Sequence, residues 1–269
     1  MIPKIIHYCW LGRGEMPELV KQCIASWHKY MPNWEYRLWN EDTLFSILNP
    51  SVNGRTSNTT DNLPVYLEEK DWLYYMPEYV KEAYQAKKYA FVSDYVRLWA
   101  LEQYGGLYMD VDFEVYKSFD DLMDQYDAFA GYEGSKHNPV MMGVIAAKAH
   151  HPWIQGMLLT YNQRSFIKVD GSYDMTPNTG YFLNWMHDRG FVADGNEKDF
   201  MSVHILPVEC FCPILTTGEN LRCEKTYCEH KGLHSWSSDV GWKKKLLNLL
   251  GNKWRIRLIK LKRKYWDYF

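Results

Sequence analysis

Two aspartates separated by one residue, Asp110 and Asp112, are the side chains of this sequence best suited to bind a divalent cation. They lie in a run from 107 to 115 whose alternation of apolar and polar residues predicts one β-strand, with both carboxylates on its polar face. Side chains two positions apart on a strand are roughly 6.5–7 Å from each other. The pair can therefore share one hydrated cation, Mn²⁺ or Mg²⁺, or bind the cation and a ligand hydroxyl. A solvated acidic strand face is the alternative.

A helix is expected directly before this strand. Ser93 is expected to cap it, and Gly105-Gly106 to end it. Asp94 and Arg97 then lie three residues apart in its first turn, on the same side. One interpretation is a simple salt bridge within the helix, and the other is contact with a bound ligand. The two residues can do both.

The elements that must position these residues follow from hydrophobic periodicity and from turn residues. Strands are expected over residues 2–10 and 34–39, and helices over residues 16–30 and 77–88. The polar stretch 49–62 is expected to be an exposed loop. Strands that alternate with helices in this order predict an α/β fold with a mostly parallel sheet.

Composition excludes several classes of protein. The chain has 269 residues, of which 46% are hydrophobic and 24% charged, so a disordered chain and a collagen-like fibre are excluded. Aromatic residues make up 16%, which suits stacking on sugars and bases as well as ordinary cores. Because no apolar run reaches the length of a membrane span and the start lacks the layout of a signal peptide, the expected compartment is the cytosol.

Several other candidate residues receive structural interpretations. The six cysteines lack paired C-x-x-C spacing and are expected to be reduced, partly buried thiols. A zinc site is the alternative for four of them, namely Cys210, Cys212, Cys223 and Cys228. His7 is expected to be a buried core histidine. Glu114 is expected to be a solvated carboxylate rather than a catalytic one.

The last 29 residues differ from the rest of the chain. Residues 241–269 carry ten Lys and Arg against one Asp, whereas residues 1–240 sum to −11. Apolar side chains recur every three or four residues among these cations, as in a helix that lies in an anionic membrane interface. The organisation predicted is a domain over 1–238 and a basic amphipathic tail over 239–269. The alternatives are a helix packed on its own domain and nucleic-acid binding, which the acidic remainder disfavours.

Three blocks of the sequence resemble glycosyltransferase family 32, which includes capsular-polysaccharide transferases, and more distantly the catalytic domain of the clostridial glucosylating toxins. The blocks are IPKIIHYCWLG, FVSDYVRLWALEQYGGLYMDVD and TYCEHKGLHSW, in the order of the family. The resemblance implies a GT-A fold and a retaining hexosyltransferase that uses a nucleotide diphosphate sugar and Mn²⁺ or Mg²⁺.

The resemblance also implies roles for single residues. Trp10 would stack on the base, Asp94 and Arg97 would hold the donor sugar and phosphate, Asp110 would contact ribose or sugar, and Asp112 would ligate the metal. Arg97, Asp110 and Asp112 are the catalytic candidates of this set.

The closing block supplies the remaining candidates. His230 would help to bind the metal or the diphosphate; Lys231 stands where a second histidine is common, so His234 is the alternative metal ligand. Ser235 and Trp236 would close over the diphosphate, and Asn178 would contact the donor. Lys231 is a further candidate cation for the phosphates.

The activity expected from this resemblance is transfer from UDP-galactose, UDP-glucose or UDP-N-acetylglucosamine to a glycan acceptor, on a polyprenyl carrier, in surface or capsular polysaccharide synthesis. The tail would hold the enzyme at the inner face of the cell membrane. Front-face attack is favoured over a covalent intermediate because no nucleophile is evident. The alternatives are a metal-dependent nucleotidyl- or phosphoryl-transfer enzyme and a non-catalytic protein that binds sugar or membrane.

Overall fold

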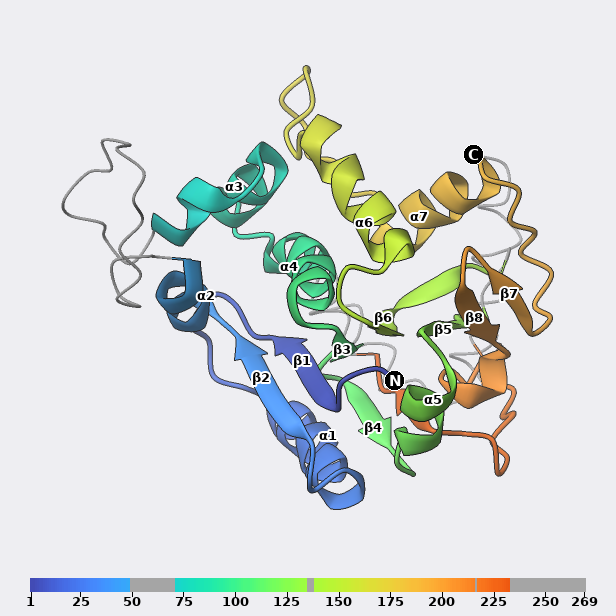
Figure 1. Cartoon of the computed structure of the whole chain (residues 1–269). Coiled ribbons are helices and arrows are strands. Elements are labelled where there is room, and N and C mark those ends of the chain that lie inside the picture. The colour runs from blue at the N-terminus through green and yellow to red at the C-terminus, as the bar shows by residue number, and fades with distance from the viewer. Residues whose placement is uncertain (49–70, 135–137, 216, 233–269) are drawn as a thin grey trace, which may run out of the picture.

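The computed structural model describes residues 1–48, 71–134, 138–215 and 217–232 (Figure 1). The polar stretch 49–62 and the tail 239–269 therefore lie outside the described residues. The strands are β1 Ile5–Cys9, β2 Glu35–Trp39, β3 Gly106–Met109, β4 Phe113–Val115, β5 Ala128–Tyr132, β6 Val140–Ala147, β7 Lys198–Phe200, β8 Val203–Leu206 and β9 Cys228–His230. The α-helices are α1 Glu18–Tyr30, α2 Glu41–Leu48, α3 Glu78–Gln85, α4 Tyr89–Tyr104, α5 Asp120–Gln125, α6 Pro152–Leu159 and α7 Asn178–His187. Short 3₁₀ segments are η1 Asp71–Tyr75, η2 Thr160–Gln163 and η3 Val208–Cys210.

Within the described residues, a seven-stranded sheet has the order β2-β1-β3-β6-β5-β8-β7. The pairs β1–β2, β1–β3 and β5–β8 are parallel, whereas β3–β6, β5–β6 and β7–β8 are antiparallel. The α/β class is confirmed, but the sheet is mixed rather than mostly parallel. The reason is that β5 and β6 are joined without a crossover helix, and a direct connection of this kind makes neighbouring strands antiparallel.

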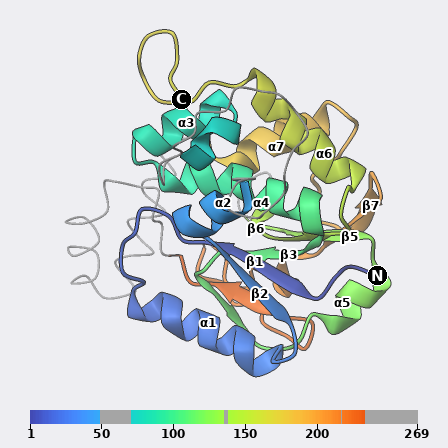
Figure 2. The same cartoon turned by 60° about the vertical axis from the view of Figure 1, so that its left-hand side comes forward.

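Each face of the sheet is covered by its own core. On one face, α2, α3, α4, α6 and α7 bury large side chains such as Trp39, Trp72 and Trp153 (Figures 1 and 2). On the other face, α1 and α5 pack with the small β4–β9 sheet around Trp27, Phe113 and related side chains (Figure 2). The two layers hold the carboxyl ends of β1 and β3 in place between them.

Helix α4 begins earlier than the sequence predicts. It starts at Tyr89, so Ser93 lies inside it and donates its hydroxyl to the carbonyl of Ala90 at 2.7 Å rather than capping the helix. Lys87 has a φ of 57°, and this left-handed residue separates α3 from α4. Asp94 and Arg97 consequently lie in the second and third turns, not the first.

The strand expected over 107–115 is two strands in two different sheets. β3 ends at Met109 and β4 begins at Phe113, with a turn between them in which the Phe113 N–H donates to the Asp110 carbonyl at 3.2 Å. The prediction of one continuous strand is wrong because apolar and polar residues alternate on both sides of the turn, so the period of two hides the break. The Asp-x-Asp pair therefore lies in a turn at the carboxyl end of β3, an interior strand of the main sheet.

Candidate active site

A cavity of about 800 Å³ opens at the carboxyl ends of β1 and β3. Its wall is formed by the ends of these strands, the start of α4, the turn that follows β3, the start of α7 and the end of β9. Seven predicted site residues line it: Trp10, Asp94, Arg97, Asp110, Asp112, Asn178 and His230. The predicted residues His234, Ser235 and Trp236 lie outside the described residues.

Arg97 connects α4 to the Asp-x-Asp turn. Its Nη2 is 2.9 Å from Asp94 Oδ1 and 3.3 Å from Asp110 Oδ1, while Nη1 donates to the Met142 carbonyl at 2.6 Å. The Tyr108 hydroxyl also donates to Asp110 Oδ1, at 2.8 Å. The buried guanidinium and the two partly buried acids thus form one unit, so the predicted salt bridge is present and it extends beyond the helix.

Burial acts on both carboxylates of this unit. It raises the pKa of Asp94 to about 6, against the opposing effects of Arg97 and Asn178. Burial also raises the pKa of Asp110, and the Arg97 guanidinium again opposes the rise. The charged form of each acid therefore depends on the neighbouring cation.

Asp112 and His230 meet although 118 positions separate them in the sequence. Nε2 of His230 is 3.1 Å from Oδ2 of Asp112, and the imidazole stacks on the Phe113 ring with the centroids 4.8 Å apart. Desolvation alone would lower the pKa of His230, but the hydrogen bond and charge of Asp112 outweigh it and raise this pKa. The contact arises because β9 pairs with β4 and brings His230 opposite Phe113.

These two side chains fit a divalent cation. A carboxylate oxygen and an imidazole nitrogen 3.1 Å apart have about the separation of adjacent ligands on an octahedral ion with bonds of roughly 2.1 Å. Within the described part of the chain, no three His, Cys, Asp or Glu side chains form a potential metal site. Mg²⁺-type ions are commonly held by one or two protein ligands that are completed by substrate phosphates and water, so the pair suits a metal–diphosphate complex.

Trp10 lies on a loop that is held by two hydrogen bonds and by close packing against Tyr89. The Gly12 N–H donates to Glu41 Oε1 at 2.7 Å, and the Trp10 indole donates to the Gly14 carbonyl at 2.6 Å. Gly12 has a φ of +90°, and a Cβ there would be 2.3 Å from the Tyr89 ring. Tyr89 also lines the cavity, and sequence analysis missed it because no local pattern indicates that α4 begins beneath this loop.

Asn178 is the first residue of α7 and is 6% exposed. It favours the ionised form of Asp94, yet neither amide atom makes a well-formed hydrogen bond with a described residue. A buried amide of this kind has donor and acceptor capacity for a ligand hydroxyl.

Two predictions for polar residues need correction. Lys231 does not face the cavity as a phosphate cation, because its ammonium lies 2.5 Å from Glu114 and 3.1 Å from Glu229. Glu114 is accordingly ion-paired rather than simply solvated. His7, by contrast, is the core histidine expected: it contacts the Gly105 carbonyl at 2.8 Å and accepts from the Trp39 indole at 3.1 Å.

All six cysteines are free thiols, and only Cys223 among them is exposed. The zinc alternative has no support among the described residues, since no metal-ligand group forms there.

Comparison with known proteins identifies the class. The family model described as a glycosyltransferase sugar-binding region containing the DXD motif matches residues 17–129. An uncharacterized glycosyltransferase, L373, of Acanthamoeba polyphaga mimivirus is 22% identical over 246 residues, which cover 88% of this chain and 84% of that protein. Inositol phosphoceramide mannosyltransferase 1 of Schizosaccharomyces pombe is 26% identical over 127 residues, which cover 46% of this chain and 32% of the yeast protein.

Solved structures with similar coordinates include the PaToxG glycosyltransferase, with a TM-score of 0.45, 19% identity and coverage of 70% of this chain and 71% of that one. The galactosyltransferase LgtC has a TM-score of 0.37, 10% identity and coverage of 84% and 86%.

These matches indicate a glycosyltransferase enzyme, with similarity to the Asp-x-Asp sugar-binding region over residues 17–129. The predicted resemblance to the Asp-x-Asp glycosyltransferases is thereby confirmed. The fold has the α/β architecture expected from that resemblance, with the mixed sheet as the correction to its strand directions.

Proposed function

We propose that this glycosyltransferase transfers a hexose from a nucleotide diphosphate sugar, with a UDP-sugar as the favoured donor, and that Asp112 and His230 hold the Mn²⁺ or Mg²⁺ that binds the diphosphate. The observation that carries the proposal is the 3.1 Å contact between these two side chains on the wall of the cavity that Arg97 and Asp110 also line. A divalent cation bound there would neutralise the charge that develops on the departing diphosphate.

The other residues of the cavity would bind and orient the donor. Trp10 offers a ring face for the base. Asp94 and Asp110 accept hydrogen bonds from sugar or ribose hydroxyls, and Asn178 offers the amide described above. Arg97 keeps the two carboxylates charged, and its position 2.9 Å from Asp94 fixes their arrangement.

Retention of anomeric configuration is proposed to occur by front-face attack. A covalent intermediate requires a carboxylate free to attack the anomeric carbon. Arg97 contacts Oδ1 of both Asp94 and Asp110, and Tyr108 also donates to Asp110 Oδ1, so part of the negative charge of each carboxylate is neutralised. These contacts make either acid a weak nucleophile and a good acceptor of hydroxyl hydrogen bonds.

The acceptor is proposed to be a glycan on a lipid carrier, in surface or capsular polysaccharide synthesis at the cytosolic face of the membrane. The name of the yeast relative, an inositol phosphoceramide mannosyltransferase, describes a lipid acceptor for that protein. Among the described helices, none is both long and apolar enough to cross a membrane. Attachment would instead depend on the basic tail 239–269, at about 1 kcal/mol per Lys or Arg near anionic lipid.

A thermal-shift panel tests the donor and metal sites together. UDP-hexoses, UDP-N-acetylglucosamine and GDP-mannose are each added with and without Mn²⁺ to the full chain, to Asp112→Asn and to the exposed control Asp124→Asn. A ligand at 100 times its Kd stabilises by about 2.7 kcal/mol, which is about 5–11 °C for a domain of this size. The shift should require Mn²⁺ in the parent and in Asp124→Asn and be absent in Asp112→Asn. An equal shift in Asp112→Asn would contradict the proposed site.

Co-sedimentation with anionic liposomes tests the tail. Truncation after Asp239 should release the protein from the vesicles, while Mn²⁺-dependent hydrolysis of the donor continues. Unchanged co-sedimentation of the truncated protein would refute the membrane role.

A further inference from the structure

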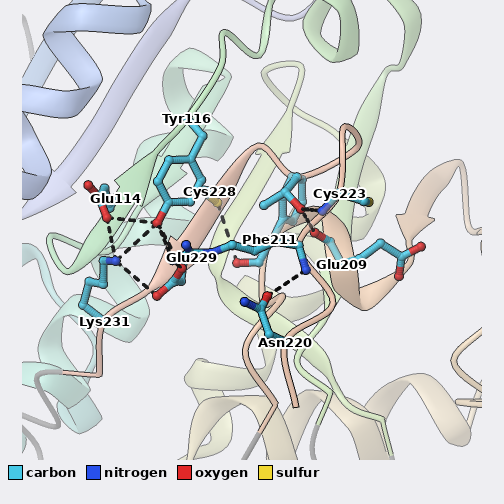
Figure 3. A network of polar contacts seen from close by, with 11 residues as sticks. Glu114, Tyr116, Glu209, Phe211, Asn220, Cys223, Cys228, Glu229 and Lys231 are labelled. Atoms are coloured by element: carbon cyan, nitrogen blue, oxygen red, sulfur yellow. Dashed lines mark hydrogen bonds and ion pairs between the residues drawn. The ribbon is translucent and has the colours of Figure 1, made fainter. Parts of the chain in front are cut away.

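A cluster of charged residues and one tyrosine lies on and around the β4–β9 sheet (Figure 3). Its members Glu114 and Lys231 are close in sequence to Asp112 and His230. The charge cluster, as we name it, consists of Glu114, Tyr116, Arg222, Glu229 and Lys231. None of its members is among the residues proposed above to bind the donor or the cation. Its two acids and two bases balance each other, so its function is not to attract a charged ligand.

The β4–β9 ladder contains an unfavourable pair. Glu114 lies directly opposite Glu229, and Phe113 lies opposite His230 in the neighbouring position. Like charges directly opposite each other on antiparallel strands are destabilising. Because each strand spans only three residues, Phe113–Val115 and Cys228–His230, repulsion at the central pair acts directly on the position that holds His230.

The charge cluster relieves this repulsion. The Lys231 ammonium bridges the two acids, 2.5 Å from Glu114 Oε2 and 3.1 Å from Glu229 Oε1. The Tyr116 hydroxyl is 2.9 Å from Glu114 and 3.0 Å from Glu229, and it accepts from Arg222 Nη2 at 2.9 Å. Arg222 also forms an ion pair with Glu229.

Both acids are ion-paired in this setting. Lys231 contacts each of them, and Arg222 contacts Glu229 as well. The repulsion that Lys231 screens is therefore between two carboxylates.

Lys231 is also tied to the metal-binding pair through its main chain. Its N–H donates to the Asp112 carbonyl at 2.8 Å. The same residue therefore joins the end of β9 to Asp112 by its backbone. Its side chain joins β9 to β4 through Glu114 and Glu229, as Figure 3 shows.

We propose that the charge cluster, with Lys231 as its central cation, is a positioning device that holds β9 against β4 and keeps His230 within bonding distance of Asp112. The inference rests on the proposed function of Asp112 and His230 as cation ligands. Lys231 is then a positioning residue, not a phosphate ligand, and its charge acts through Glu114 and Glu229.

Mn²⁺ binding to the full chain tests this proposal, with free Mn²⁺ measured by electron paramagnetic resonance and no nucleotide present. Lys231→Met should weaken Mn²⁺ binding by about tenfold or more, as is usual when groups that orient metal ligands are removed. Lys231→Arg should retain most of the affinity because the cation remains. The double variant Lys231→Met/Glu114→Gln should recover much of the loss, since only one carboxylate is left at the central pair.

Two further variants separate positioning from general loss of stability. Lys198→Met is the control. Lys198 lies on β7, at the end of the sheet remote from β1 and β3, and its ammonium is 2.6 Å from Asp194. This variant should bind Mn²⁺ like the parent. Tyr116→Phe keeps the ring and removes the hydroxyl between the two acids. It provides a milder test if Lys231→Met does not fold, and it should weaken Mn²⁺ binding severalfold.

The outcomes distinguish the two proposals. If Asp112→Asn loses Mn²⁺ binding while Lys231→Met and Tyr116→Phe bind like the parent, the positioning role is overturned and the metal site stands. If the double variant binds no better than Lys231→Met, relief of the glutamate repulsion is not the mechanism. If Asp112→Asn itself binds Mn²⁺ normally, the proposed metal site fails.

Discussion

Replacing Arg97 by methionine removes the cation that two carboxylates of the cavity share. The guanidinium lies 2.9 Å from Asp94 and 3.3 Å from Asp110, and its side chain is 6% exposed. Methionine has similar length and packs in apolar surroundings, so the substitution removes charge and hydrogen bonds more than volume. The Met142 carbonyl also loses the donor now at 2.6 Å.

The expected cost follows from the burial of the ion pairs. Breaking a buried pair by removing one partner costs about 3–5 kcal/mol because the other charge is left uncompensated. For a domain of this size, each kcal/mol lowers Tm by about 2–4 °C, which gives a decrease of about 6–20 °C at pH 7.

The pH dependence separates charge from packing. Without Arg97, the folded-state pKa of Asp94 and Asp110 rises further above the unfolded value of about 3.9. A carboxyl with a raised folded pKa binds its proton more tightly in the folded state, so lower pH stabilises the variant relative to the parent. The stability difference should therefore shrink as the pH falls from 7 toward 5.

Urea unfolding at pH 7 and pH 5 measures this difference for the parent and for Arg97→Met. Arg189→Met, whose arginine lies over the Trp185 ring with its guanidinium carbon 4.0 Å from the ring centroid, serves as the control, and its effect should be small at both pH values. A stability loss in Arg97→Met that is the same at both pH values would refute the electrostatic reasoning and leave packing as the cause.

Three further predictions concern the donor site. If Asp94 holds the donor as proposed, Asp94→Asn should raise the donor KM at pH 7. It should also abolish the rise in KM expected of the parent below about pH 6, because Asp94 accepts hydrogen bonds as a charged group only above its raised pKa. Gly143→Ala should destabilise the protein by about 1–3 kcal/mol and weaken donor binding, since its Cβ would be 2.8 Å from Asp110 Oδ2. Trp10→Ala should weaken UDP binding by about 1–3 kcal/mol, or about 5- to 150-fold, if the ring stacks on the base. The measurements are steady-state kinetics across pH, urea unfolding with UDP titration, and calorimetry with UDP and Mn²⁺, respectively.

Each of these predictions has a contrary result. If the KM of Asp94→Asn still rises below about pH 6, that rise belongs to the titration of another group. Normal UDP affinity in Gly143→Ala would show that Asp110 can move without consequence. Unchanged UDP affinity in Trp10→Ala would place the base elsewhere in the cavity.

Local patterns in the sequence predicted the elements that begin the fold. The expected strands over 2–10 and 34–39 and the expected helices over 16–30 and 77–88 correspond to β1, β2, α1 and α3. These elements were predictable because their periodicity and bounding turn residues are properties of short windows. The Asp-x-Asp pair was found in the same way, since the chemistry of two carboxylates depends on residue type and spacing.

The pairing of Asp112 with His230 came from a resemblance, not from local physics. No window of the sequence contains both residues, and only the antiparallel register of β4 and β9 brings them together. The same register places Glu114 opposite Glu229 and turns Lys231 away from its expected role. The sequence-based prediction for Lys231 was wrong because its partners are set by this long-range pairing.

The sequence by itself indicated the candidate residues for binding a metal, a sugar and a base, and the class of fold in which they lie. Tertiary structure decided where the chain turns between β3 and β4, which acids Arg97 neutralises, and which cation separates Glu114 from Glu229. The physical reason is that side-chain alternation has the same period of two whichever sheet a strand joins. The choice of sheet depends instead on packing and hydrogen bonding with residues more than a hundred positions away.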